Sequence, residues 1–303
     1  QKYFNICSKL VNNPRININE QTYKGNTALH YAVYSGDIEI LNLLLSNINV
    51  NVSIRGEKNY TPLNLAIINS FNAAIELLLA HKADIDLVDE DGRSPLINSV
   101  VKDNYEITKI LLQNNANMYV IDNNSFTALH MAIENKNLKM VELFIANDFD
   151  LTFKNEMGIT PFHWAVRKGD LNIISKIYYT NKNLAKALDI NGSSPLHWAV
   201  DYNHYNVVEF LLKNKVSPDV KDDASSILSL FKYQNTDEDF EIFQNETKAG
   251  FTPLHYAVFY GYENIVKLLL EYNANINDDE NILRIAPIHL AVTQQNFSLI
   301  ESL

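Results

Sequence analysis

The sequence contains few of the residues that cross-link a chain, hold a metal or cross a membrane. A single cysteine, Cys7, allows no internal disulfide and no thiolate cluster for a metal ion. The longest apolar runs fall well short of the roughly 20 residues that span a bilayer. A glycine-rich phosphate loop, the zinc motif H-E-x-x-H and a nucleophile elbow are all absent from the sequence. These absences predict a chain without catalysis, cofactor or metal site.

Basic residues are also scarce. The chain has 25 Lys and Arg against 36 Asp and Glu, a net charge of −11 and an isoelectric point near 5.2. Nucleic acids and anionic membrane surfaces attract proteins through Lys and Arg. The charge balance therefore argues against nucleic acid as the partner and against direct insertion into a membrane. An apolar content of 47% is ample for a folded core.

One hexapeptide recurs along the whole chain. It reads TALHYA from Thr27 and returns as TPLNLA from Thr61, SPLINS from Ser94, TALHMA from Thr127, TPFHWA from Thr160, SPLHWA from Ser194, TPLHYA from Thr252 and APIHLA from Ala286. Successive copies begin 34, 33, 33, 33, 34, 58 and 34 residues apart. So many copies in register predict a protein built from repeats.

The residues of this motif suit the beginning of a helix. Every copy except the one at Ala286 begins with Thr or Ser, whose side-chain oxygen caps a helix and contributes about 1 kcal/mol. Proline follows in six copies, at the first helical position, where its missing N–H costs nothing. Most copies end in Ala, and Ser99 is the exception. A second apolar stretch at helical spacing follows, as in residues 38–45 and 107–112, so each repeat is predicted to contain two helices.

A period near 33 that begins with T-P-L-H-x-A resembles the ankyrin-repeat family, over essentially the whole chain. The resemblance implies an all-α solenoid of stacked helix-turn-helix units with hairpin-like loops. The predicted organisation is a single array over residues 1–303, with an N-terminal half repeat (1–21) and eight repeats (22–303), the last truncated. Because the chain opens at Gln1 with what reads as a second helix, we expect it to be a piece of a longer protein.

Glycines fall at two recurring sites, the end of the first helix and the turn before the motif. Gly36 and Gly169 are examples of the first site, and both sites favour a left-handed backbone. Three repeats place other residues in the turn before the motif. Asn59 tolerates the left-handed conformation, whereas Ser125 and Arg284 fit it poorly, so we expect altered turns at these two positions.

Six of the eight histidines occupy the fourth motif position. They are His30, His130, His163, His197, His255 and His289. The resemblance implies that each imidazole binds the loop and the capping hydroxyl, and that His204 is a further family histidine after the turn between helices. The histidines are therefore predicted to be structural rather than metal ligands.

Two other groups of residues are predicted to be structural. Trp164 and Trp198 share the fifth motif position with Tyr31, Leu65, Met131, Tyr256 and Leu290, and all are expected to pack between layers. The acidic cluster at residues 84–91 faintly resembles a calcium loop. Leu87 stands where the first ligand belongs, so a solvated loop is predicted.

The resemblance also implies where a partner binds. In ankyrin proteins the turn tips and the exposed face of the first helices form a concave binding surface. Carried over to this sequence, that surface predicts these partner-binding residues: Tyr60, Phe126, Met157, Ile159, Arg167, Lys168, Tyr202 and Phe251. Aromatic residues and arginine are enriched at binding hot spots. Two adjacent cations at Arg167 and Lys168 predict a protein or extended peptide with acidic character.

One interval breaks the period. The 58 residues between Ser194 and Thr252 exceed a normal repeat by 25, which predicts an insertion at 223–248 between repeats six and seven. Three hypotheses stay open for this insertion: a partner-binding element, a lid that folds onto the Arg167 and Lys168 region, or an inert excursion.

The expected function is a protein–protein interaction module or scaffold, with no catalysis inside these residues. The first alternative is a substrate-recognition or targeting arm of a larger enzyme, effector or toxin whose active domain lies elsewhere. The second is the cytoplasmic array of a membrane channel. The expected location is intracellular and cytoplasmic. It becomes the host cytosol if the chain is an exported bacterial effector, since the bias toward Asn, Ile and Lys is typical of AT-rich genomes of such bacteria.

Overall fold

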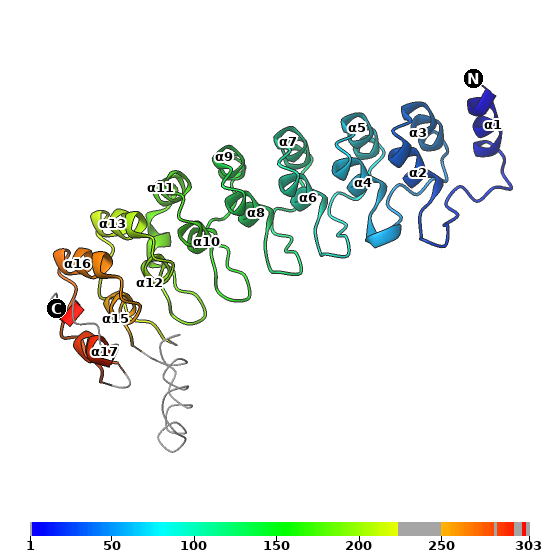
Figure 1. Ribbon diagram of the computed structural model, residues 1–303. Coiled ribbons are helices and arrows are strands. Elements are labelled where there is room, and N and C mark those ends of the chain that lie inside the picture. Colours follow the sequence, from blue (N-terminus) through cyan, green and yellow to red (C-terminus); the bar gives the residue numbers. More distant parts are fainter. Residues whose placement is uncertain (1, 224–249, 282–283, 294–298, 301–303) are drawn as a thin grey trace, which may run out of the picture. The chain divides into compact units, whose positions relative to one another are not determined.

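The computed structural model describes residues 2–223, 250–281, 284–293 and 299–300, and these ranges contain helices but no strands (Figure 1). The chain divides into two compact units, Gln1–Phe149 and Asp150–Leu303. The predicted insertion at 223–248 lies outside the described residues except for Asp223. The prediction of a single array over residues 1–303 stays a prediction.

Unit 1 consists of paired helices that follow the repeat. They are α1 (Lys2–Val11), α2 (Ala28–Ser35), α3 (Ile38–Leu45), α4 (Pro62–Ile68), α5 (Asn72–Ala80), α6 (Pro95–Val101), α7 (Tyr105–Gln113), α8 (Ala128–Glu134) and α9 (Leu138–Ala146), with a short 3-10 turn, η1 (Glu57–Asn59). The first helices of the repeats, α2, α4, α6 and α8, pack against one another in that order. Among the second helices, α3 contacts both α1 and α5.

Unit 2 repeats the same arrangement. It contains α10 (Pro161–Lys168), α11 (Leu171–Thr180), η2 (Lys182–Lys186), α12 (Pro195–Asp201), α13 (Tyr205–Lys213), α15 (Pro253–Phe259), α16 (Glu263–Glu271) and α17 (Pro287–Thr293). The first helices α10, α12, α15 and α17 pack in that order, and α13 packs against α16. The packing of α12 on α15 therefore bridges the sequence interval that breaks the period.

The core of each layer comes from the apolar positions of both helices. In the second repeat, Leu63 and Ala66 of α4 and Ile75 and Leu78 of α5 are completely buried. The Ala at the sixth motif position is buried in every repeat that has one, because a small side chain lets neighbouring first helices approach closely. Most of the stability of such short helices comes from this packing.

Helix caps form as the sequence predicts. The hydroxyl of Ser94 accepts a hydrogen bond from the backbone N–H of Ile97 at 3.3 Å, and Thr61 accepts one from Asn64 at 3.2 Å. Gly169 ends α10 with φ 71° and returns its N–H to carbonyl oxygens of the last turn. The motif therefore marks the helix starts correctly.

The prediction of altered turns at Ser125 and Arg284 is wrong. Ser125 has φ 64° and Arg284 has φ 51°, close to φ 75° at the equivalent Gly92. Each donates the expected turn hydrogen bond, Ser125 to the Asp122 carbonyl and Arg284 to the Asn281 carbonyl, both at 2.9 Å. A left-handed L-residue costs roughly 1–2 kcal/mol, and the surrounding turn outweighs this cost here.

Successive turn tips are joined by backbone hydrogen bonds. In unit 1, the N–H of Glu90 donates to the carbonyl of Lys58 at 3.0 Å, and the N–H of Asn123 donates to Asp91 at 3.0 Å. In unit 2, Ile190 donates to Met157 at 2.9 Å and Asp223 donates to Asn191 at 2.8 Å. Each of these four hydrogen bonds between neighbouring tips uses main-chain atoms alone.

Candidate functional site

Three of the motif histidines join a helix start to the turn tip of the next repeat. Nδ1 of His197 accepts the backbone N–H of Ser194 at 3.2 Å and lies 2.9 Å from its hydroxyl, while Nε2 donates to the Phe251 carbonyl at 3.0 Å. His30 and His255 make the equivalent bonds to the tip of the following repeat. These three histidines agree with the role that the resemblance implies, whereas Nε2 of His130 is buried without a hydrogen-bond partner among the described residues.

The hydroxyl–imidazole pairs resemble a nucleophile and its general base, but burial excludes that chemistry. Ser194 and His197 are inaccessible to solvent, and the hydroxyl also accepts the N–H of His197 at 3.4 Å as a helix cap. Burial lowers the pKa of His130, His163 and His197 to about 4, so these imidazoles are neutral at pH 7. A group without access to substrate cannot act on one.

Buried acidic residues in the turns form a second network, which the sequence analysis missed. Asp89 is buried, accepts the N–H of Asp91 and of Arg93, and accepts Nδ2 of Asn98 at 2.9 Å. The prediction that the whole acidic cluster is a solvated loop is therefore wrong at Asp89. The signal was present, because an Asp or Asn stands five residues before the cap in five of the repeats.

The same network fixes the aromatic residues at the fifth motif position in unit 2. Trp198 donates its indole N–H to Asp189 at 2.9 Å, and the Tyr256 hydroxyl donates to Asp222 at 2.6 Å. Trp164 and Tyr256 are buried as expected, but Tyr31 at this position is half exposed. The expectation that the whole row packs between layers is therefore wrong at Tyr31.

The predicted partner-binding residues fall into two groups. Phe251 has 0% exposure and Ile159 has 7%, so both belong to the core and cannot contact a partner in this structure, contrary to the prediction. The reason is that their side chains turn inward while their backbone N–H groups bind Asp222 and Asn155 of the same turns. Six predicted residues keep exposed surface: Tyr60, Phe126, Met157, Arg167, Lys168 and Tyr202.

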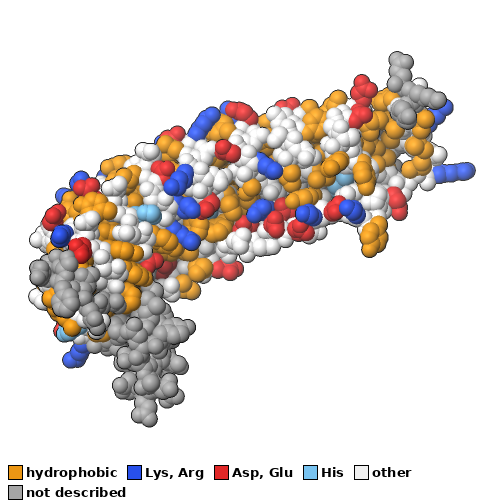
Figure 2. Space-filling view, in the orientation of Figure 1, with side chains coloured by type: hydrophobic (Ala, Val, Ile, Leu, Met, Phe, Trp, Pro, Cys, Tyr) orange, Lys and Arg blue, Asp and Glu red, His pale blue; other side chains and the backbone are white. Residues whose placement is uncertain are grey.

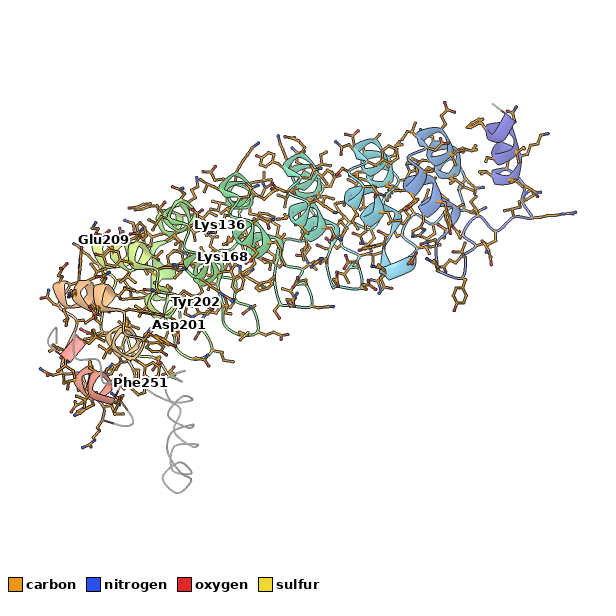
Figure 3. The ribbon with its side chains drawn as sticks, in the orientation of Figure 1. Lys136, Lys168, Asp201, Tyr202, Glu209 and Phe251 are labelled. Carbon is orange, nitrogen blue, oxygen red and sulfur yellow. The ribbon has the colours of Figure 1, made fainter. Side chains whose placement is uncertain are left out.

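Arg167, Trp164 and Tyr202 form one cluster in unit 2. The Arg167 guanidinium carbon lies 4.4 Å from the centre of the Trp164 ring and 5.2 Å from the centre of the Tyr202 ring. Figure 3 labels Lys168 at the end of α10 and Tyr202 at the end of the neighbouring α12. His204 Nε2 donates to the Arg167 carbonyl at 2.8 Å and so holds the end of α10. The structure thus brings together two of the residues predicted for partner binding, Arg167 and Tyr202.

A further set of aromatic rings belongs to the repeat of α15 and α16 in unit 2. Tyr260 lies 5.3 Å from Phe259, 5.5 Å from Tyr262 and 6.5 Å from Tyr256, measured between ring centres. Phe259, Tyr260 and Tyr262 are each partly exposed. Phe259 and Tyr260 lie at the end of α15, the first helix of its repeat, which packs on α12.

In the part of the chain that the structure describes, no three His, Cys, Asp or Glu side chains are placed to hold a metal ion. None of the helices in that part has the length and apolar character needed to cross a membrane. Cys7 is a half-buried free thiol.

Family models match most of the chain. The model for ankyrin repeats in three copies matches residues 1–89, 64–155 and 129–222, and the model for a single ankyrin repeat matches residues 249–281. This chain belongs to the ankyrin-repeat family. The described ankyrin repeats are accordingly a protein–protein interaction module.

Individual relatives match parts of the chain. An ankyrin repeat protein of Rickettsia bellii is 36% identical over 81 residues, which cover 27% of this chain and 80% of that protein. The target of rapamycin complex 2 subunit AVO2 of Saccharomyces cerevisiae is 34% identical over 76 residues, which cover 25% of this chain and only 18% of the yeast protein. The crystal structure of the ankyrin repeat domain of Bcl-3 superposes with a TM-score of 0.64 at 20% identity, covering 81% of this chain and all of that chain, and this likeness concerns the fold alone.

Proposed function

We propose that this ankyrin array binds a partner protein through the exposed face of the first helices of unit 2, with Arg167 and Tyr202 at its centre and the buried Trp164 ring supporting the guanidinium. The observation that carries the proposal is the guanidinium held 4.4 Å and 5.2 Å from two aromatic rings. Stacking of this kind fixes the orientation of the side chain, so less conformational entropy is lost when a partner binds.

The surroundings of the cluster indicate the character of the partner. Lys168 follows Arg167 directly, and Met157 is 56% exposed at the tip before α10. A cationic centre flanked by aromatic and apolar groups suits an acidic side chain with an apolar neighbour. We therefore propose a protein or extended peptide partner of acidic character. The roles as a recognition arm of a larger enzyme or as the array of a channel, and the cytoplasmic location, stay predictions.

A pair of charge-reversal variants tests the surface. Arg167→Glu with Lys168→Glu should abolish capture of the partner, because both cations are replaced by carboxylates that repel an acidic ligand. The matched control is Lys182→Glu with Lys186→Glu, which makes the same charge change at two exposed positions of η2. The measurement is capture by the wild-type chain and by each variant, compared by quantitative mass spectrometry. Equal loss of the captured protein in both variants would refute a specific role for Arg167 and Lys168.

A further inference from the structure

A hollow in unit 1 is lined by three tyrosine rings. Its volume is about 520 Å³, and the rings of Tyr31, Tyr34 and Tyr60 line it together with Leu65. Tyr34 is 76% exposed, Tyr31 is half exposed and Tyr60 is half buried. In Figure 2 hydrophobic side chains gather over the N-terminal helices of this unit. Aromatic faces carry negative charge density and attract cations.

Unit 2 shows which group such a surface accepts. Trp164 and Tyr31 occupy the same fifth position of the motif, and Arg167 and Tyr34 occupy the same position three residues later. In the fifth repeat the guanidinium of Arg167 lies over the ring of Trp164 at 4.4 Å. In the first repeat tyrosine replaces arginine, and no Lys or Arg of the described residues stacks on Tyr31, Tyr34 or Tyr60. The fifth-position ring is repeated there without the cation, and Tyr34 and Tyr60 add two further rings.

Two lysines and one glutamate line the hollow, and all three are already paired. Lys24 lies 3.0 Å from Glu57, and Lys58 lies 3.7 Å from Glu90, so neither lysine is left to attract an anion. Burial raises the pKa of Tyr60, and the negative charge of Asp89 raises it further. The whole chain carries a net charge of −11, which attracts basic partners over distance.

We propose that this hollow receives an arginine side chain of a partner polypeptide, with the guanidinium stacked on the tyrosine rings and directed toward the Glu57 carboxylate. Arginine fits better than lysine because its planar group stacks on rings and is more weakly hydrated. The volume leaves room for part of the backbone that carries the arginine. The site is separate from the Arg167 surface and takes the opposite charge.

A titration followed on the tyrosine rings tests the proposal. The protein, labelled with ¹³C in its tyrosine rings, is titrated with N-acetyl-arginine amide, N-acetyl-leucine amide and N-acetyl-glutamate amide while ring resonances are recorded by NMR. We expect saturable shifts of the Tyr31, Tyr34 and Tyr60 signals with the arginine probe and several-fold weaker effects with the other two. Equal or larger effects of the leucine probe would mean an apolar site, and of the glutamate probe an anion site. Either result, or no saturable shift, overturns the proposal.

Two substitutions sharpen the test. Tyr34→Ala should lower the affinity for the arginine probe about two- to five-fold, the contribution of one exposed ring. Tyr179→Ala, at a 62% exposed tyrosine of α11, should leave that affinity unchanged. Lys24→Gln should raise the affinity for the arginine probe, because it releases Glu57 from its ion pair. A lower affinity in Lys24→Gln would contradict the proposal. The double variant at Arg167 and Lys168 should not alter this titration, so the two proposals fail independently.

Discussion

Replacing Met131 by tyrosine should stabilise unit 1, because it supplies a hydrogen-bond donor that a buried carboxylate lacks. Asp122 is 4% exposed, and its Oδ1 accepts the N–H of Asn124 and of Phe126, each at 2.9 Å. Its Oδ2 is buried without a partner among the described residues. In other repeats the fifth motif residue donates to this oxygen, as Tyr256 does to Asp222 at 2.6 Å, but Met131 has no donor to offer.

The size of the effect follows from the charge of the acceptor. A hydrogen bond to a charged group contributes about 1.5–3 kcal/mol. Met131→Phe adds the same ring without the hydroxyl, so the difference between the Tyr and Phe variants isolates the new bond. With a urea dependence of roughly 2 kcal/mol per molar, that difference shifts the unfolding midpoint by about 1 M.

The assay is urea unfolding of the wild type, Met131→Tyr and Met131→Phe, each repeated in the presence of Asp122→Asn. The difference in free energy of unfolding between Met131→Tyr and Met131→Phe should shrink when the Asp122 charge is removed, because it comes from the hydrogen bond between the new hydroxyl and Asp122. Equal midpoints for the Tyr and Phe variants would show that Oδ2 is already satisfied, for example by water, and would refute the reasoning.

Two further outcomes are expected. The free energy of unfolding should fall as the pH drops from about 6.5 toward about 4, because the pKa of the buried His197 is about 4 in the folded chain and 6.5 ordinarily, so protonation favours the unfolded chain. His197→Asn should reduce this pH dependence, measured as urea unfolding midpoints across that range. An unchanged pH dependence would assign the effect to other groups. Phe251→Ala should cost about 3–5 kcal/mol of stability because it empties a fully buried position, so a normal thermal unfolding curve combined with lost binding would return Phe251 to the partner surface.

The repeat, its helix starts and the histidine contacts could be predicted from the sequence because each depends on local chemistry. A capping hydroxyl, a proline at the first helical position and an imidazole three residues after the cap act within one turn of helix. The contact of Arg167 with Tyr202 was not predicted, although the spacing of the repeat places both residues at the ends of successive first helices.

The errors concern which way a side chain turns. Phe251 and Met157 both belong to turn tips, yet one is fully buried and the other half exposed. Sequence spacing gives the position of a residue in the turn but not the packing of the following layer, which decides exposure. Asp89 is a different kind of error, because its partners Arg93 and Asn98 lie close to it in the sequence and the recurring Asp or Asn before the cap already indicated the contact.

The backbone hydrogen bonds that join successive turn tips have an evolutionary consequence. The accepting backbone carbonyl groups belong to four residues with unlike side chains, Lys58, Asp91, Met157 and Asn191. Since main-chain atoms alone make these bonds, the identity of the residue at each position is open to mutation without loss of the link. Binding specificity can therefore change through single substitutions at the tips, while the backbone hydrogen bonds that hold the tips together are kept.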